Sequence, residues 1–238
     1  MAEIGYGYGS EWHLMRFMAR HRNHLEDAIR AAIGNNTGSF YWYDFGFGGT
    51  GIATDKERKG LSFLDNPSSL EGYIKGWNTS QSWDAVFRLN DIIYLVEAKA
   101  HIAEMSNDGN NGGTSKREIK KFISENLAKQ NISINIDRCL GKYYQLANRL
   151  ATAAFLKNNG INARCLYIYF INGYEKPNDI KNATVEMYVD EINKEKAVLG
   201  LEGESLEDLL FHVFIDAKSR DFNYLSKSLI KKLCYSFR

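Results

Sequence analysis

The sequence predicts an α/β domain whose elements run in the order helix, three strands, helix, strand. Two observations lead to this fold class. Segments 10–34 and 140–160 repeat apolar residues every three or four positions, as helices that bury one face do. Segments 39–45, 82–99 and 163–171 are instead short and rich in β-branched and aromatic residues, which is typical of strands.

The helical segments carry start and stop signals as well as periodicity. Ser10 suits an N-cap, and Gly34 suits the end of the first helix. Ser115 and Glu118 have the spacing of a capping box, which predicts a further helix between the hairpin and segment 140–160. We therefore expect one helix before the strands and helical structure between the third and fourth strands.

Segment 82–99 is the most informative part of the chain, because it reads as a hairpin hinged at Asn90-Asp91. With two central turn residues, the pairing brings Asp84 opposite Glu97. The same register pairs Leu89 with Ile92 and Val86 with Leu95. Side chains alternate along a strand, so Asp84, Glu97 and Lys99 are expected to share one face.

Two opposed carboxylates at the end of a buried hairpin are unfavourable unless a cation lies between them. Directly opposed Cβ atoms lie about 4.5–5.5 Å apart, and like charges at that distance destabilise a strand pair. A hard dication such as Mg²⁺ takes carboxylate oxygens and water, so Asp84 and Glu97 are candidate metal ligands. Lys99 would point to the same spot and assist an attacking water. The alternative is an exposed salt-bridge ladder on an edge hairpin.

The Glu-x-Lys spacing alone is weak, because an acid two residues before a lysine occurs five times in the chain. The main rival is Asp216 with Lys218, which follows the apolar run 209–215. That run has no preceding strand to supply a second acid, and its spacing also suits a helix. Only Glu97 combines a strand, a register-matched Asp and a lysine on one face.

These residues resemble the signature of the PD-(D/E)xK nuclease superfamily. Asp84 matches its first acid, Glu97 and Lys99 match its Glu-x-Lys, and Glu11 is the candidate acid from the first helix. Trp83 stands where the signature has proline. The element order matches the superfamily over about residues 10–171, which implies a restriction-endonuclease-like core (α-β-β-β-α-β) with a central mixed sheet flanked by helices.

The resemblance also implies a function and a set of roles. It implies a Mg²⁺-dependent deoxyribonuclease that hydrolyses phosphodiester bonds in DNA, as an endonuclease rather than an exonuclease, with Mn²⁺ able to substitute. Glu11, Asp84, Glu97 and Lys99 would form the catalytic site. A second hypothesis is a non-catalytic nucleic-acid-binding or assembly module of the same fold. A third is a nucleotide-binding enzyme that uses the glycine-rich segment 46–51.

Composition sets the remaining expectations. The 238 residues, 44% of them hydrophobic, suffice for one domain spanning 1–238, with an insertion around 46–81 and a C-terminal extension at 172–238. The net charge of +1 neither indicates nor excludes DNA as a partner. No apolar run is long enough for a membrane span, and three cysteines without metal-type spacing fit the reducing cytoplasm. The sequence leaves a homodimer open.

Four more polar residues are candidates for positions around the proposed site, and two of them, His13 and His101, lie near its residues in the sequence. Gln145 and Arg149 share one side of segment 140–160, where they would approach a scissile phosphate or form ordinary helical surface. His13 and His101 are expected to be polar residues at the rim of the site rather than catalytic groups.

Overall fold

A computed structural model describes residues 9–43, 58–67, 70–74, 81–106, 115–173 and 183–218 of the chain.

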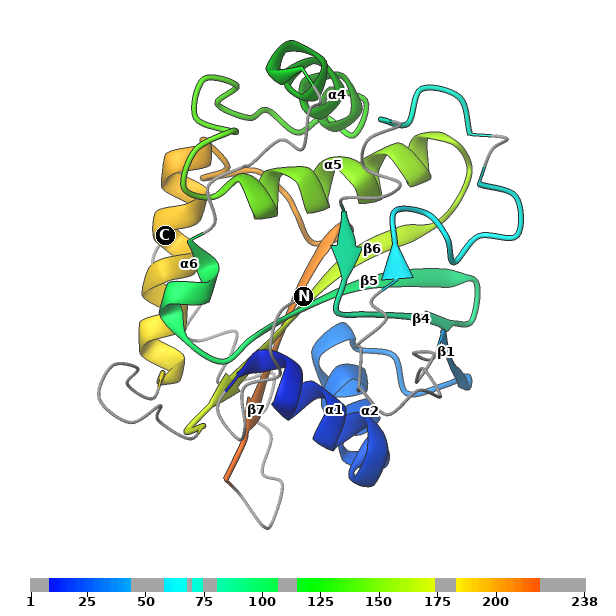
Figure 1. Cartoon of the computed structure of the whole chain (residues 1–238), viewed down its shortest axis with the longest axis vertical. Helices are drawn as coiled ribbons and strands as arrows, with labels where there is room; N and C mark the ends of the chain where they lie inside the picture. The colour runs from blue at the N-terminus through cyan, green and yellow to red at the C-terminus, as the bar shows by residue number, and fades with distance from the viewer. Residues whose placement is uncertain are drawn as a thin grey trace, which may run out of the picture.

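The centre of the fold is a five-stranded mixed sheet with the strand order β1-β4-β5-β6-β7 (Figure 1). Its strands are β1 (Phe40–Trp42), β4 (Ala85–Leu89), β5 (Ile92–Lys99), β6 (Ala163–Ile171) and β7 (Leu210–Asp216). The first two pairings, β1 with β4 and β4 with β5, are antiparallel. The next two, β5 with β6 and β6 with β7, are parallel. The predicted α/β class with a mixed central sheet is therefore confirmed.

Two short N-terminal helices cover one face of this sheet. They are α1 (Ser10–Arg20) and α2 (Arg22–Ile33), and both contribute apolar side chains to one buried cluster with β4, β5 and β6. The sequence predicted a single helix here, but His21 leaves the helical region, with φ −130° and ψ 33°. Gly34 ends α2 in the left-handed conformation, as its position indicated.

Three helices, α4 (Lys116–Ala128), α5 (Tyr144–Asn158) and α6 (Val185–Leu199), contribute to a second buried cluster that includes Val86, Leu95 and Tyr167 of the sheet. Figure 1 shows α5 on the side of the sheet away from α1 and α2. The side chain of Ser115 accepts a hydrogen bond from the amide of Glu118 at 3.2 Å, so the predicted N-cap of α4 is confirmed. The functional residues described below lie in this second layer.

The chain after residue 172 supplies two elements of this core, α6 and β7. The apolar run at 209–215, whose spacing also suited a helix, forms the edge strand β7. Strands in parallel sheets are buried on both faces and read as continuous apolar runs, so periodicity does not separate them from buried helices. The described residues 183–218 thus supply a flanking helix and complete the sheet.

Three smaller elements fill in the fold around the hairpin. β2 (Arg58–Lys59) pairs with β3 (Ser82–Trp83) as a separate two-stranded ribbon, and the 3₁₀ helix η2 (Ile102–Met105) follows β5. Among the described residues, no helix has the length and apolarity needed to cross a membrane. Cys139 and Cys165 are buried free thiols.

Candidate functional site

The hairpin has the register that the sequence predicted. Leu89 pairs with Ile92 and Val86 pairs with Leu95, so the turn has two central residues. Asn90 adopts a positive φ of 54°, a conformation that Asn tolerates better than most residues. The last pair of the ladder is Ala85 with Val96, and the next residues outward are Asp84 and Glu97.

Asp84 lies at a bend between β3 and β4 and turns its side chain toward β5. Its Oδ2 atom accepts a hydrogen bond of 2.6 Å from the backbone amide of Ala98. The carboxylate of Asp84 also acts electrostatically on Lys99 and on Arg149 of α5. Asp84 is only half-buried, so solvent reaches the site on its side.

Glu97 and Lys99 project from the face of β5 that carries α5. Leu95 belongs to the buried cluster that includes residues of α4 and α5. Val96 and Ala98 belong to the other cluster, which includes residues of α1 and α2. Because side chains alternate along the strand, Glu97 and Lys99 lie on the Leu95 face. They are 3% and 5% exposed, respectively, so this pair is not a surface ladder.

Lys99 and two residues of α5, Gln145 and Arg149, occupy both oxygens of the Glu97 carboxylate. Oε1 accepts hydrogen bonds from Lys99 Nζ and Gln145 Nε2, each at 2.7 Å. Oε2 accepts from Arg149 Nε at 3.0 Å. Lys99 Nζ also donates to Gln145 Oε1 at 2.7 Å, which closes a ring of three side chains. We call Asp84, Glu97, Lys99, Gln145 and Arg149 the hairpin–helix network.

Trp83 helps to fix the position of Arg149. The guanidinium carbon of Arg149 lies 4.5 Å from the centre of the Trp83 ring, within the range of a cation–π contact. One terminal nitrogen of Arg149 donates to the backbone oxygen of Ser82 at 2.6 Å. The indole nitrogen of Trp83 in turn donates to the Gly60 oxygen at 2.7 Å. The residue in place of the expected proline therefore forms one wall of the network.

The charges in this network balance. Burial alone would raise the pKa of Glu97, but Lys99 and Arg149 outweigh burial and hold that pKa below its ordinary value. Burial alone would lower the pKa of Lys99, but Glu97 and Asp84 hold it above its ordinary value. Two carboxylates thus face two cations. The expectation that the acids repel each other without metal overlooked Arg149.

The two carboxylates have the donor chemistry that Mg²⁺ requires. A carboxylate has about four acceptor sites, and Glu97 uses three of them. Half-buried Asp84 adds a second carboxylate, and Mg²⁺ is commonly held by one or two carboxylates plus water. In the described part of the chain, no three His, Cys, Asp or Glu side chains are grouped to hold a metal. Among these side-chain types, a metal held here would therefore rely on Asp84 and Glu97.

Glu11, the fourth predicted site residue, begins the other layer. It lies half-buried in the first turn of α1, whose apolar side packs on the opposite face of the sheet from α5. The hydrogen bonds that Glu97 and Lys99 form among the described residues stay within β5 and α5. The structure therefore brings Asp84, Glu97 and Lys99 together and does not show Glu11 bonded to Glu97 or Lys99.

Gln145 and Arg149 are the members whose role the sequence left undecided. Arg149 is 7% exposed and bonded to Glu97, so it is not helical surface. The available signal was the i, i+4 spacing of two polar residues on a helix that is otherwise mostly apolar. Burial of most of that helix became visible only from its packing against α4 and β6.

The two histidines near the site are buried and do not lie at its rim. His101 Nδ1 lies 2.9 Å from Glu104 Oε1 of η2. His13 is packed against Phe170 at 5.2 Å between ring centres. Burial, and then the charge of Arg16, lower the pKa of His13 to about 4, so it is neutral at pH 7.

Comparisons with known proteins add no relative to this picture. A scan against protein-family models, a search of curated proteins and a search of solved structures each found no match. The glycine-rich segment 46–51, proposed for nucleotide binding, lies outside the described residues.

Proposed function

We propose that this protein is a Mg²⁺-dependent phosphodiesterase that cleaves DNA, with a restriction-endonuclease-like core. The observation that supports the proposal is the gathering of Asp84, Glu97 and Lys99 on one face at the end of the β4–β5 hairpin. Asp84 and Glu97 would hold the metal. Bound there, Mg²⁺ would supply a Lewis acid for a phosphoryl oxygen and lower the pKa of a bound water.

The surroundings of Lys99 indicate the role that it would play. Glu97 and Asp84 oppose the effect of burial and hold the pKa of Lys99 above its ordinary value. In its charged form, Lys99 would stabilise negative charge developing on the phosphoryl group. Gln145 bonds both Lys99 and Glu97 and would set their relative positions.

The second candidate function is a non-catalytic nucleic-acid-binding or assembly module. The specific observation in its favour is that Glu97 is already neutralised by Lys99 and Arg149 under nearly complete burial. Such a network can have a purely structural role, with no part in catalysis. The two candidates differ in whether cleavage depends on Asp84, the half-buried carboxylate of the network.

The test is cleavage of supercoiled, linear and single-stranded DNA in Mg²⁺ and in Mn²⁺ by wild type and Asp84→Asn. The matched control is Asp137→Asn, because Asp137 is an exposed acid that pairs with Lys120. We expect wild type and Asp137→Asn to nick the circular substrate, and Asp84→Asn to lose at least about 100-fold in rate, which corresponds to about 2.7 kcal/mol.

Melting curves recorded beside the assay separate lost chemistry from lost folding. If folded wild type leaves every substrate intact with both metals, the non-catalytic module is the correct reading. If Asp84→Asn cleaves as fast as wild type, the proposed site is wrong. Cleavage of linear but not circular DNA would change the assignment from endonuclease to exonuclease.

A further inference from the structure

A second feature of the fold, outside the hairpin–helix network, is an aromatic and basic surface at the β1 edge of the sheet. Tyr41 is 57% exposed, more than any other large hydrophobic side chain in the described residues. The rings of Tyr41 and Tyr43 lie 5.2 Å apart and nearly perpendicular, at 88°. Arg88 of β4 pairs with Tyr41 in the sheet, and its guanidinium carbon lies 5.5 Å from the centre of that ring.

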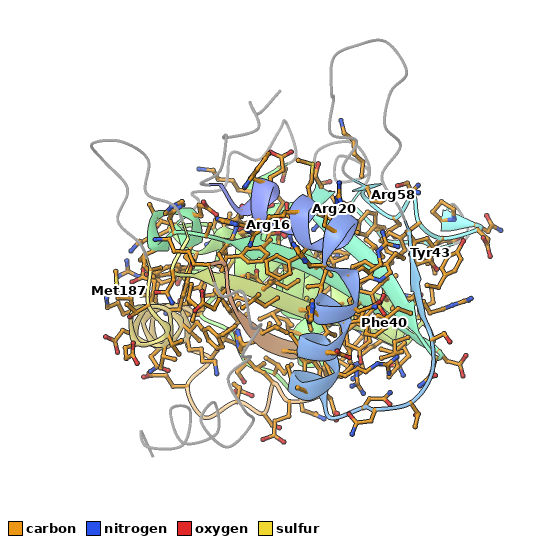
Figure 2. The ribbon with its side chains drawn as sticks, turned by 90° about the horizontal axis from the view of Figure 1, so that it is seen from below. Arg16, Arg20, Phe40, Tyr43, Arg58 and Met187 are labelled. Carbon is orange, nitrogen blue, oxygen red and sulfur yellow. The ribbon has the colours of Figure 1, made fainter. Side chains whose placement is uncertain are left out.

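Arg58 adds a second positive charge beside these rings. It acts electrostatically on Tyr43, as Arg88 does, and Figure 2 shows Arg58 and Tyr43 near each other on one side of the molecule. Among the described residues, Asp65 is the acid that acts on Tyr43. We call Tyr41, Tyr43, Arg58 and Arg88 the β1-edge patch.

The β1-edge patch and the hairpin–helix network lie on the same face of β4. Arg88, Val86 and Asp84 are alternate residues, and Val86 packs in the cluster on the α5 side. Four residues of extended chain span about 13 Å. An extended polymer bound at Arg88 is therefore within a few monomer lengths of Asp84.

An exposed aromatic ring and a half-buried one beside arginines suit one class of polymer best. Unpaired bases stack on aromatic side chains, and arginines beside those rings attract the phosphates. In a duplex the faces of the bases are covered by their neighbours, so flat aromatic surface gives little advantage there. Tyr41 lies on an edge strand with much of its ring exposed, where a base would stack without rearrangement of the core.

We propose that the β1-edge patch binds single-stranded nucleic acid, with bases stacked on Tyr41 and Tyr43 and phosphates at Arg58 and Arg88. The proposal that the patch binds single strands depends only on these contacts. Delivery of the strand to Asp84 rests on the proposed nuclease function. The inference thus names unpaired nucleic acid as the substrate class presented to the site.

The test is fluorescence anisotropy with a labelled 20-nucleotide thymidine strand and a 20-base-pair duplex in EDTA, so that cleavage plays no part. Loss of one base–aromatic stack costs about 1–3 kcal/mol, so we expect Tyr41→Ala to weaken single-strand binding about 5- to 150-fold. Tyr41→Phe keeps the ring and should bind within about twofold of wild type. Met187→Ala is the control, because Met187 is 41% exposed on α6 and lies on the other side of the molecule in Figure 2.

Arg88→Gln tests the electrostatic half of the proposal. Each phosphate contact contributes about one unit to the slope of log affinity against log salt, so this slope should fall by about one in Arg88→Gln. Lys121→Gln, which removes an exposed charge from α4, should leave the slope unchanged.

Three outcomes would overturn the inference: equal single-strand binding by Tyr41→Ala and wild type, tighter binding of duplex than of single strand, or no nucleic-acid binding at all. The last outcome would favour a protein partner for the patch. Asp84→Asn separates the two proposals, because it should bind the single strand like wild type whether or not wild type cleaves it.

Discussion

Replacing Glu97 with Gln should strongly destabilise the protein, because the carboxylate is the centre of the hairpin–helix network. Its side chain accepts hydrogen bonds from two cations, Lys99 at 2.7 Å and Arg149 at 3.0 Å, and both cations are buried. The neutral amide leaves these two charges with only the half-buried carboxylate of Asp84 to offset them. Removing one partner of a buried ion pair costs about 3–5 kcal/mol. A domain of this size loses about 2–4 °C of Tm per kcal/mol, so the Tm should fall by about 6–20 °C.

The assay is thermal and urea denaturation of wild type, Glu97→Gln and the double variant Glu97→Gln/Lys99→Met. The double variant removes one stranded cation and should recover part of the lost stability. Glu202→Gln, at an exposed position, is the control and should stay within about 0.5 kcal/mol of wild type. If Glu97→Gln is as stable as Glu202→Gln, the buried network does not exist as described.

The difference in stability between wild type and Glu97→Gln should also depend on pH. The pKa of Glu97 is lower in the folded protein than its ordinary value of 4.5, because Lys99 and Arg149 outweigh the opposing effect of burial. Its contribution to stability is therefore complete above pH 4.5 and is lost as the pH falls through the folded pKa. The stability gap between wild type and Glu97→Gln should narrow in acid. A gap that widens below pH 4.5 would contradict the ion pairs.

Three further predictions concern other parts of the fold. Burial raises the pKa of Glu195 from 4.5 to about 8, so the folded state holds a proton that the unfolded state releases between these values. Wild type should therefore lose stability relative to Glu195→Gln from pH 4.5 to 8, by up to about 5 kcal/mol, in urea titrations at several pH values. Ser115→Ala removes the N-cap of α4 and should cost about 1 kcal/mol by denaturation, and Ser115→Asp should restore it. Glu11→Gln should reduce the rate of DNA cleavage far less than Asp84→Asn, because α1 packs on the other face of the sheet.

Local sequence patterns predicted the hairpin well because its register depends on few residues. The two-residue turn at Asn90 and the alternation of apolar side chains fixed the pairing of Leu89 with Ile92, and every other pair followed. The same local logic placed Glu97 and Lys99 on one face. The break at His21 was missed, because a helix end without proline or glycine carries a weak local signal. The run 209–215 was left open between strand and helix, because a strand buried on both faces lacks the alternation that would separate the two.

The electrostatic state of the site was beyond the reach of local patterns. Arg149 is separated from Glu97 by 52 residues, yet its guanidinium neutralises that carboxylate. In the hairpin alone, two acids and one lysine carry a net negative charge, and this charge favours the binding of a metal cation. With Arg149 included, two carboxylates face two cations, so charge balance alone does not require a metal.

This balance determines what a metal must do to bind. A dication placed between Asp84 and Glu97 would meet Lys99 and Arg149 at close range, so its binding energy must exceed the repulsion that it introduces. We therefore expect Arg149→Met, which removes one of these charges while keeping an apolar side chain of similar length, to bind Mn²⁺ more tightly than wild type in calorimetric titrations. Asp84→Asn should bind Mn²⁺ more weakly. The order Arg149→Met, wild type, Asp84→Asn is specific to a metal held at this network, and equal Mn²⁺ affinity in all three proteins would place any bound metal elsewhere.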